Sequence, residues 1–329
     1  MLKKLIAATA LLSLAATGLQ AQEAKKYKIG AAVYGVKNEF VQLWVKALKD
    51  HPAVKSGQVN LTVFDGQYKH ITQANQFDSM ITQKFDGAIY IPIDSNAGAA
   101  VVAKSTAAGL PVVGSNGPTT SDKLVSYVGS DDVLGGQLAA EAVIKAMGGK
   151  GNIVVLEGPV GQTGAIQRSE GIDKVLAKHP DIKVIERKTA NWSRAEAMTL
   201  MQNWLTAHPN QIQGVIGEND EMALGAVAAM KQAGVDVTKI PVAGIDGVSD
   251  AIKAVSKGEM ILSIRQDAKT QAQGALDVLI RNLAGADYKP QSEVWTTYPD
   301  LTWGDGTAKL YSVQWTLVTK ENAAEFLKK

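Results

Sequence analysis

The chain has 329 residues, of which 46% are hydrophobic and 20% are charged, and its formal net charge is +2. This composition is ordinary for a globular protein, and with no basic tail or stripe it argues against a nucleic-acid-binding protein. The sequence contains no cysteine, which excludes disulfides, thiol nucleophiles and cysteine-ligated metals.

Residues 1–21 have the pattern of a secretory signal peptide. Lys3 and Lys4 precede an apolar run that starts at Leu5, and small residues follow as far as Ala21. The apolar run is too short to span a membrane as a helix. We therefore expect cleavage near Ala21, a mature chain that begins near Gln22, and export to the periplasm without a lipid anchor.

One unit recurs along the rest of the chain: a short β-branched run, a polar or glycine-rich turn, and an alanine-rich amphipathic helix. The predicted strands cover residues 28–35, 59–65, 87–93, 111–116, 124–130, 152–158, 183–189, 214–218, 241–246 and 261–266. The predicted helices cover residues 38–50, 70–83, 97–107, 132–147, 163–178, 193–207, 221–233, 248–256 and 268–283. This alternation predicts an α/β fold with parallel sheets. The number of strands suits two doubly wound, Rossmann-like lobes.

Polar side chains follow the carboxyl ends of several predicted strands. They are Asn38, Asn116, Arg168, Asn219, Asp246 and Gln266. Each one alone is explained by capping or turn chemistry. In a parallel sheet, however, these strand ends share one edge, which is where open α/β folds bind ligands. Neutral amides with one Arg and one Asp suit hydroxyl groups better than an anion or a metal.

Three aromatic residues lie close to these polar positions. Tyr34 ends the first strand, Phe40 comes just after Asn38, and Trp192 stands at the start of a helix. A tryptophan at a helix start either packs in the core or presents a face to a ligand. The sequence leaves both interpretations of Trp192 open.

Motifs for catalysis or metal binding are missing. The histidines lack metal-ligand spacing; they are His51, His70, His179 and His208. The glycine-rich loop at residues 158–164 lacks the G-K-[ST] of a phosphate loop. Asp131 and Asp132 resemble a paired carboxylate but fit the start of a capped helix. We therefore expect no catalytic residues, no metal and no cofactor.

Five longer stretches together resemble the ribose-binding type of periplasmic substrate-binding protein, the soluble component of ATP-driven sugar importers. They are VGSDDVLGGQLAAEAV, GPVGQTGAIQRSEGI, MQNWLTAHPNQIQGVIGENDEMALGAVAAM, PVAGIDGVSDAIKAVSKGEM and SIRQDAKTQAQGA. The resemblance runs from about Lys28 to Thr319. It implies the type I periplasmic binding protein fold, in which two lobes joined by a three-crossing hinge close over a sugar.

The resemblance also implies a division into lobes. The expected N-terminal lobe comprises residues 27–130 and 267–299. The expected C-terminal lobe comprises residues 131–266 and 300–329.

The family motifs imply ligand-binding roles for particular residues of this chain. Those that match are Asn38, Phe40, Arg168, Trp192, Asn219, Asp246 and Gln266. Trp192 stands where the family places a stacking aromatic ring, and Asn219 is the Asn of the NDEMALGA stretch. Tyr34, which ends the first strand, and Asn116, which follows PVVGS, complete the expected site.

The chain departs from the family pattern at three places. Glu39 replaces a usual Pro, Val41 replaces a second Phe, and Asn116 with Gly117 replaces a common Asp-Arg pair. The loss of a charged pair permits a polyhydroxylated ligand other than a pentose, such as an inositol or an alditol.

The resemblance implies three kinds of partner: a small neutral sugar or polyol, an inner-membrane ABC permease and, in a chemosensory role, a chemoreceptor. We expect a monomer. The main alternative is a chemosensory protein or one that binds a non-sugar signal such as a furanone. A lac-repressor-type regulator would need a helix-turn-helix, and a nucleotide-dependent oxidoreductase would need a phosphate loop; the sequence shows neither.

Overall fold

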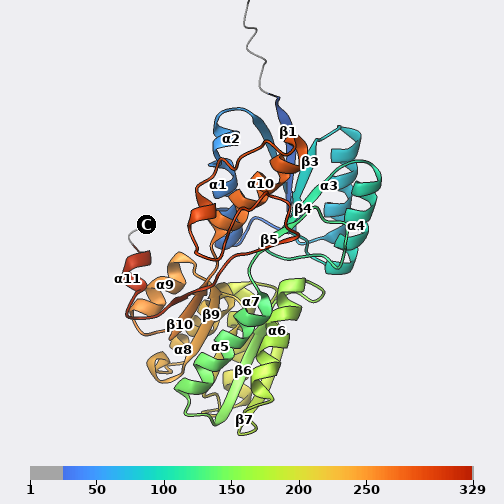
Figure 1. Ribbon diagram of the computed structural model, residues 1–329. Helices are drawn as coiled ribbons and strands as arrows, with labels where there is room; N and C mark the ends of the chain where they lie inside the picture. The colour runs from blue at the N-terminus through green and yellow to red at the C-terminus, as the bar shows by residue number, and fades with distance from the viewer. Residues whose placement is uncertain (1–24, 328–329) are drawn as a thin grey trace, which may run out of the picture.

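The computed structural model describes residues 25–327, so the expected signal peptide lies outside the described residues. Two lobes are stacked end to end with a waist between them (Figure 1). Each lobe contains a six-stranded sheet, in the order β11-β5-β4-β3-β1-β2 in the N-terminal lobe and β12-β10-β9-β8-β6-β7 in the C-terminal lobe.

All strand pairs in the N-terminal sheet are parallel. Its strands are β1 (Tyr27–Val33), β2 (Val59–Asp65), β3 (Gly87–Tyr90), β4 (Val112–Ser115), β5 (Tyr127–Gly129) and β11 (Leu310–Ser312). The helices of this lobe are α1 (Glu39–Lys49), α2 (Pro52–Lys55), α3 (His70–Thr82), α4 (Ser95–Ala107), α10 (Ala268–Ala284) and the 3-10 helix η2 (Val294–Thr296). Helix α1 packs against α10, and α3 packs against α4, with the sheet between the two pairs (Figure 1).

The C-terminal sheet repeats this topology, except that β12 runs antiparallel to β10. Its strands are β6 (Gly151–Glu157), β7 (Ile182–Thr189), β8 (Gly214–Gly217), β9 (Val242–Asp246), β10 (Leu262–Arg265) and β12 (Thr316–Val318). The helices are α5 (Asp132–Ala146), α6 (Thr163–Leu176), α7 (Arg194–Ala207), α8 (Asp220–Gln232), η1 (Val237–Lys239), α9 (Ser249–Ser256) and α11 (Ala323–Phe326). Helix α5 packs against α6, and α7 packs against α8.

The chain passes between the two sheets three times: between β5 and α5, between β10 and α10, and between β11 and β12. The expected lobe division is wrong for residues 300–312. Strand β11 pairs with β5 in the N-terminal sheet, with Leu310 opposite Tyr127. Trp295 anchors the same segment to that lobe, since its ring centre lies 4.7 Å from that of Trp303. The third crossing is therefore residues 313–315.

Every predicted strand overlaps one of β1 to β10, and every predicted helix overlaps one of the longer helices. The elements that the sequence missed are short ones: α2, α11, β11, β12 and the 3-10 helices. Segments of three or four residues are too short to show a hydrophobic period.

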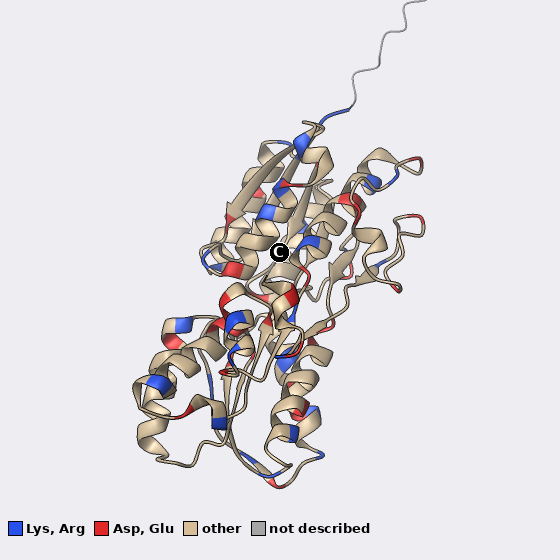
Figure 2. Ribbon diagram, turned by 90° about the vertical axis from the view of Figure 1, so that its left-hand side faces the viewer, with Lys and Arg blue, Asp and Glu red and all other residues tan. Residues whose placement is uncertain are grey.

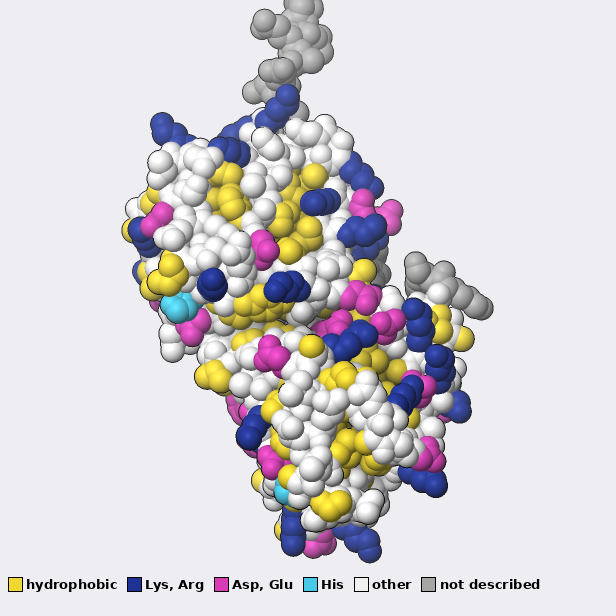
Figure 3. All heavy atoms as spheres, turned by 180° about the vertical axis from the view of Figure 1, so that it is seen from behind, with side chains coloured by type: hydrophobic (Ala, Val, Ile, Leu, Met, Phe, Trp, Pro, Cys, Tyr) yellow, Lys and Arg dark blue, Asp and Glu magenta, His cyan; other side chains and the backbone are white. Residues whose placement is uncertain are grey.

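Acidic and basic residues are intermixed on both lobes (Figure 2). In the space-filling view, apolar side chains line both sides of the waist (Figure 3). Within residues 25–327, no helix has the length and apolar character that a membrane span requires.

Candidate ligand-binding site

The predicted site residues converge at the waist, where the carboxyl ends of strands from both sheets face each other. One cavity of about 20 Å³ lies among all but one of them. Those that line it are Tyr34, Phe40, Asn116, Arg168, Trp192, Asn219, Asp246 and Gln266. A cavity of this volume has room for about one water molecule. The side chains themselves therefore fill the centre of the site.

Asn38 is the exception. It lines a larger neighbouring cavity at the mouth of the cleft, which Trp192 also lines. The Oδ1 atom of Asn38 accepts a hydrogen bond from the hydroxyl of Tyr68 at 3.0 Å. Asn38 thus lies at the rim of the site rather than at its centre.

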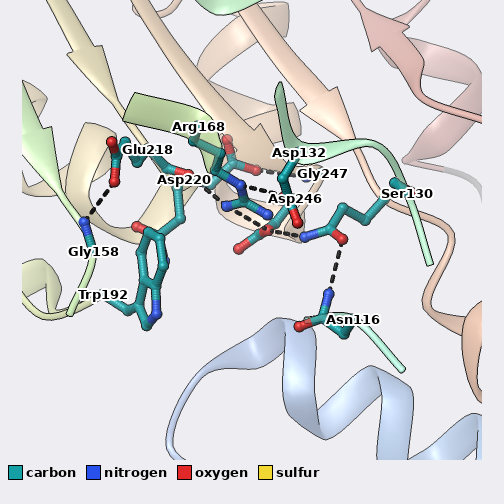
Figure 4. A network of polar contacts seen from close by, with 12 residues as sticks. Asn116, Ser130, Asp132, Gly158, Arg168, Trp192, Glu218, Asp220, Asp246 and Gly247 are labelled. Atoms are coloured by element: carbon teal, nitrogen blue, oxygen red, sulfur yellow. Dashed lines mark hydrogen bonds and ion pairs between the residues drawn. The ribbon is translucent and has the colours of Figure 1, made fainter. Parts of the chain in front are cut away.

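Arg168, on α6, is the central cation of the site and is buried. Its Nε donates to Asp132 at 2.8 Å, and its Nη1 donates to the backbone oxygen of Glu218 at 2.6 Å (Figure 4). The same Nη1 lies 3.9 Å from Asp246. The C-terminal lobe therefore fixes the Nε and Nη1 atoms of the guanidinium, and Nη1 lies between the Glu218 oxygen and Asp246.

A line of polar side chains joins the two lobes across the site. Asn116 Nδ2 donates to Gln266 Oε1 at 2.9 Å, and Gln266 Nε2 donates to Asp246 Oδ1 at 2.7 Å. Gln271 Nε2 also donates to Gln266 Oε1, at 3.1 Å. Because Gln266 follows β10 at the second crossing, this line runs from the N-terminal lobe through the hinge into the C-terminal lobe.

Trp192 is buried, and its indole Nε1 donates to Gln162 Oε1. Its ring centre lies 5.4 Å from the guanidinium carbon of Arg168, within the range of a cation–π contact. A side chain at Gly158 would collide with the indole. Glu218 holds Gly158 in place, since its Oε2 accepts the Gly158 N–H at 2.7 Å. The ring is therefore held firmly at one wall of the cavity.

The polar residues 218–220, directly after β8, provide both a cap for the next helix and a lining of the site. Asn219 Oδ1 accepts the Met222 N–H at 2.9 Å, which caps α8, while the residue also lines the cavity. Asp220 is the first residue of α8. It also accepts the N–H groups of Gly247 and Val248, at 2.7 and 2.9 Å. The helix start thus fixes the turn that presents Asp246.

Several site residues have an unusual backbone. The φ angles of Asn116 and Trp192 are both 59°, and that of Asp246 is 129°. Gly247 follows with φ 75°, and a Cβ there would lie 2.5 Å from Arg265 Cγ. Residues other than glycine rarely adopt positive φ, and such strain gathers at functional sites.

Buried carboxyl groups surround Arg168. Burial raises the pKa of Asp246 to about 8, although the charge of Arg168 opposes the shift. Burial also raises the pKa of Glu218 to about 8, against a hydrogen bond from Ser169. The pKa of Asp220 rises to about 6, again because of burial. The cleft side of this lobe therefore contains carboxyl groups that are incompletely compensated in this conformation.

The sequence interpretation missed two residues of the site. Asp132, read as part of a helix start, is the buried partner of Arg168. Gln162, read as part of a turn that leads into a helix, lines the cavity, and its Nε2 donates to the backbone oxygen of Pro92 in the other lobe at 3.2 Å. A cap residue and a pocket residue look alike in a sequence. No local signal separates the two roles.

The two lobes also touch at the edges of the cleft. The Ser95 N–H of α4 donates to the Gly161 oxygen at 3.0 Å. On another edge, Glu39 Oε1 accepts the Ser249 N–H at 3.0 Å and its hydroxyl at 2.6 Å. Glu39, the departure from the usual Pro, thus contacts the start of α9. The cleft is closed in this conformation.

Comparison with known proteins supports the resemblance to periplasmic substrate-binding proteins. A family model described as a periplasmic binding protein domain matches residues 29–287. The xylitol-binding protein of Mycolicibacterium smegmatis is 37% identical over 262 residues, which cover 80% of this chain and 74% of that protein. The ribose import binding protein of Escherichia coli is 32% identical over 267 residues, covering 80% of this chain and 87% of that protein.

Solved structures share the fold over nearly the whole chain. An ABC transporter solute-binding protein from Bacillus halodurans, with bound myo-inositol, has a TM-score of 0.81 and 27% sequence identity. The match covers 93% of this chain and 99% of that one. Its two-lobed α/β architecture is the one described above, and the chain belongs to the periplasmic binding protein family.

Proposed function

We propose that this protein is the periplasmic solute-binding component of an ABC importer and that it binds a neutral monosaccharide or related polyol between its lobes. The observation that carries the proposal is the meeting of neutral amides from both lobes around one Arg and one Asp. The similar proteins support it, because their names or titles give xylitol, ribose and myo-inositol as ligands.

The residue types suit hydroxyl groups, which both donate and accept hydrogen bonds. Asp246 would accept from a hydroxyl, and the guanidinium of Arg168 would donate to one. The amides of Asn116, Asn219 and Gln266 can do both. Because Arg168 is already opposed by Asp132 and Asp246, a neutral ligand would add no further charge to this buried cluster.

The aromatic residues suit the C–H surfaces of such a ligand. Phe40 approaches from the N-terminal lobe and Trp192 from the C-terminal lobe. Tyr34 would limit the size of the ligand, and Asn38 would contact it at the rim. Since Asn116 and Gly117 stand where sugar-binding relatives commonly carry Asp-Arg, we favour an alditol or an inositol over a pentose.

Binding would require the lobes to separate, because the closed site has room for only about one water molecule. Hinge closure around a ligand is the motion known for periplasmic binding proteins. The ligand would replace the hydrogen bonds among Asn116, Gln266 and Asp246, and the closed form would then meet the membrane permease. We infer transport rather than catalysis, and the protein would act as an exported monomer.

The ligand class is tested by a thermal-shift screen against pentoses, hexoses, inositols and alditols. A ligand at 100 times its Kd should add about 2.7 kcal/mol to the free energy of unfolding. Charged sugar acids of similar size serve as controls. Stabilisation by the charged compounds alone would contradict a site for neutral ligands.

The location is tested separately. The protein isolated from the periplasmic fraction should have an intact mass that corresponds to a chain beginning near Gln22. A full-length mass in the cytoplasmic fraction would contradict export, whatever the outcome of the ligand screen.

A further inference from the structure

Trp315 lies in the third crossing and was not singled out by the sequence. Its indole Nε1 donates to the backbone oxygen of Asp131 at 2.7 Å. Asp131 lies in the first crossing, between β5 and α5. One side chain therefore ties together two of the three connections between the lobes.

The ring of Trp315 also reaches the site. It packs on the first turn of α5, where a Cβ at Gly135 would lie 2.9 Å from the indole Cζ2. The ring centre lies 5.8 Å from the guanidinium carbon of Arg168. This distance is within the range of a cation–π contact, as is that of Trp192 to the same group.

Arg168 is thus held in two different ways. Its edges donate to Asp132 and to the Glu218 oxygen, both in the C-terminal lobe. Its guanidinium carbon also lies over the rings of two indoles, one of which, Trp315, belongs to the hinge. An arginine side chain has many rotamers, and fixing it before the ligand arrives reduces the entropy that binding must remove.

We propose that Trp315 is a positioning residue, which holds the guanidinium of Arg168 in its ligand-binding orientation and links that orientation to the hinge. The inference rests on the proposed function only as far as Arg168 contacts the ligand. If the third crossing bends when the lobes open, the Trp315 indole moves relative to the Arg168 guanidinium. The contact that orients Arg168 therefore depends on whether the hinge is open or closed.

Two matched variants separate the ring from its N–H group. Trp315→Phe and Trp315→Leu both lose the hydrogen bond to Asp131, but only Trp315→Leu loses the aromatic face. With the best ligand of the screen, calorimetry should give about tenfold weaker binding for Trp315→Leu and less than about threefold for Trp315→Phe. The apo melting temperatures of the two variants should agree. Equal affinities of the two variants would overturn the proposal.

A second measurement needs no ligand. The Arg168 Nε–H resonance, identified by its loss in Arg168→Lys, should shift and exchange faster with solvent in Trp315→Leu, and should change less in Trp315→Phe. An unchanged resonance in Trp315→Leu would overturn the positioning role. If no neutral ligand binds the wild-type protein, the proposed function fails, while this spectrum still decides the role of Trp315.

Discussion

Two buried carboxyl groups, Asp277 in the N-terminal lobe and Asp246 in the C-terminal lobe, have very different surroundings. Asp277, on α10 in the N-terminal lobe, accepts hydrogen bonds from the Tyr288 hydroxyl at 2.6 Å, the Gln291 N–H at 2.8 Å and the Trp295 indole at 2.9 Å. His51 Nε2 lies 3.2 Å away, and its Nδ1 accepts a backbone N–H, so Nε2 carries the proton. Asp277 is thus surrounded by donors.

Asp246, in the C-terminal lobe, is buried with fewer donors. Among the residues that the structure describes, its carboxylate accepts one hydrogen bond, from Gln266, and Arg168 stays 3.9 Å away. Burial raises the pKa of Asp246 to about 8. Burial would also raise the pKa of Asp277, but the hydrogen bonds from His51, Ser292 and Tyr288 bring it below the ordinary value.

The difference separates a structural carboxylate from a binding one. The donors of Asp277 all come from its own lobe, and they join α10 to the segment that leads toward β11. Asp246 has unused acceptor capacity and lies at the boundary between the lobes. The first group is satisfied by the fold, whereas we propose that the second is satisfied by a ligand.

The largest expected effect is on folding. Asp277→Ala leaves several buried donors without an acceptor and should lower the free energy of unfolding by about 3–5 kcal/mol, as measured in urea. Asp277→Asn keeps one acceptor oxygen and should cost less. The folded fraction of both variants should bind the ligand with wild-type affinity. If the Asp277 variants lost affinity strongly without losing stability, Asp277 would not differ from Asp246 in its role.

Asp246→Ala should have the opposite profile. Removing one member of a desolvated charge pair costs about 2–5 kcal/mol of binding, so a micromolar Kd would become millimolar or weaker. Asp246→Asn should cost less because an amide still accepts a hydrogen bond. Calorimetric titration gives the affinities, and apo melting curves should barely move. Full-affinity binding by Asp246→Ala would remove this residue from the site.

Trp192→Ala tests the aromatic wall of the same region. The loss of its apolar surface should weaken binding by about 1–3 kcal/mol, with Trp192→Phe as the control that keeps an aromatic ring. Apo unfolding should change less than binding. A large loss of apo stability at unchanged affinity would assign the ring to the core.

The smallest effect concerns pH. An acid whose pKa is raised in the closed state holds its proton more tightly there, so its contribution favours closure at low pH and is lost as the pH rises toward about 8. Small-angle scattering of the ligand-free protein should show a larger radius of gyration at pH 8 than at pH 5. The part of this pH-dependent change in radius of gyration that is lost in Asp246→Asn belongs to Asp246. An identical change with pH in that variant would contradict the role of Asp246.

Much of the site was predictable because strand ends carry a strong signal. Short β-branched runs stop at polar residues, and parallel pairing brings those stops to one edge. The family resemblance then supplied expected roles for residues such as Arg168 and Trp192. Asn38, one of the expected ligand-binding residues, lines the cavity at the mouth, where the Tyr68 hydroxyl donates to its Oδ1.

By itself, the sequence determined the alternation of strands and helices and the polar character of the strand ends, because both depend on neighbours a few residues apart. Only the tertiary structure decided which polar residues act as partners. Asp132 meets Arg168 from 36 positions away, and Trp315 meets Asp131 from 184 positions away. The same long-range pairing placed β11 in the N-terminal sheet. Such contacts arise from chain topology, for which a local pattern contains no signal.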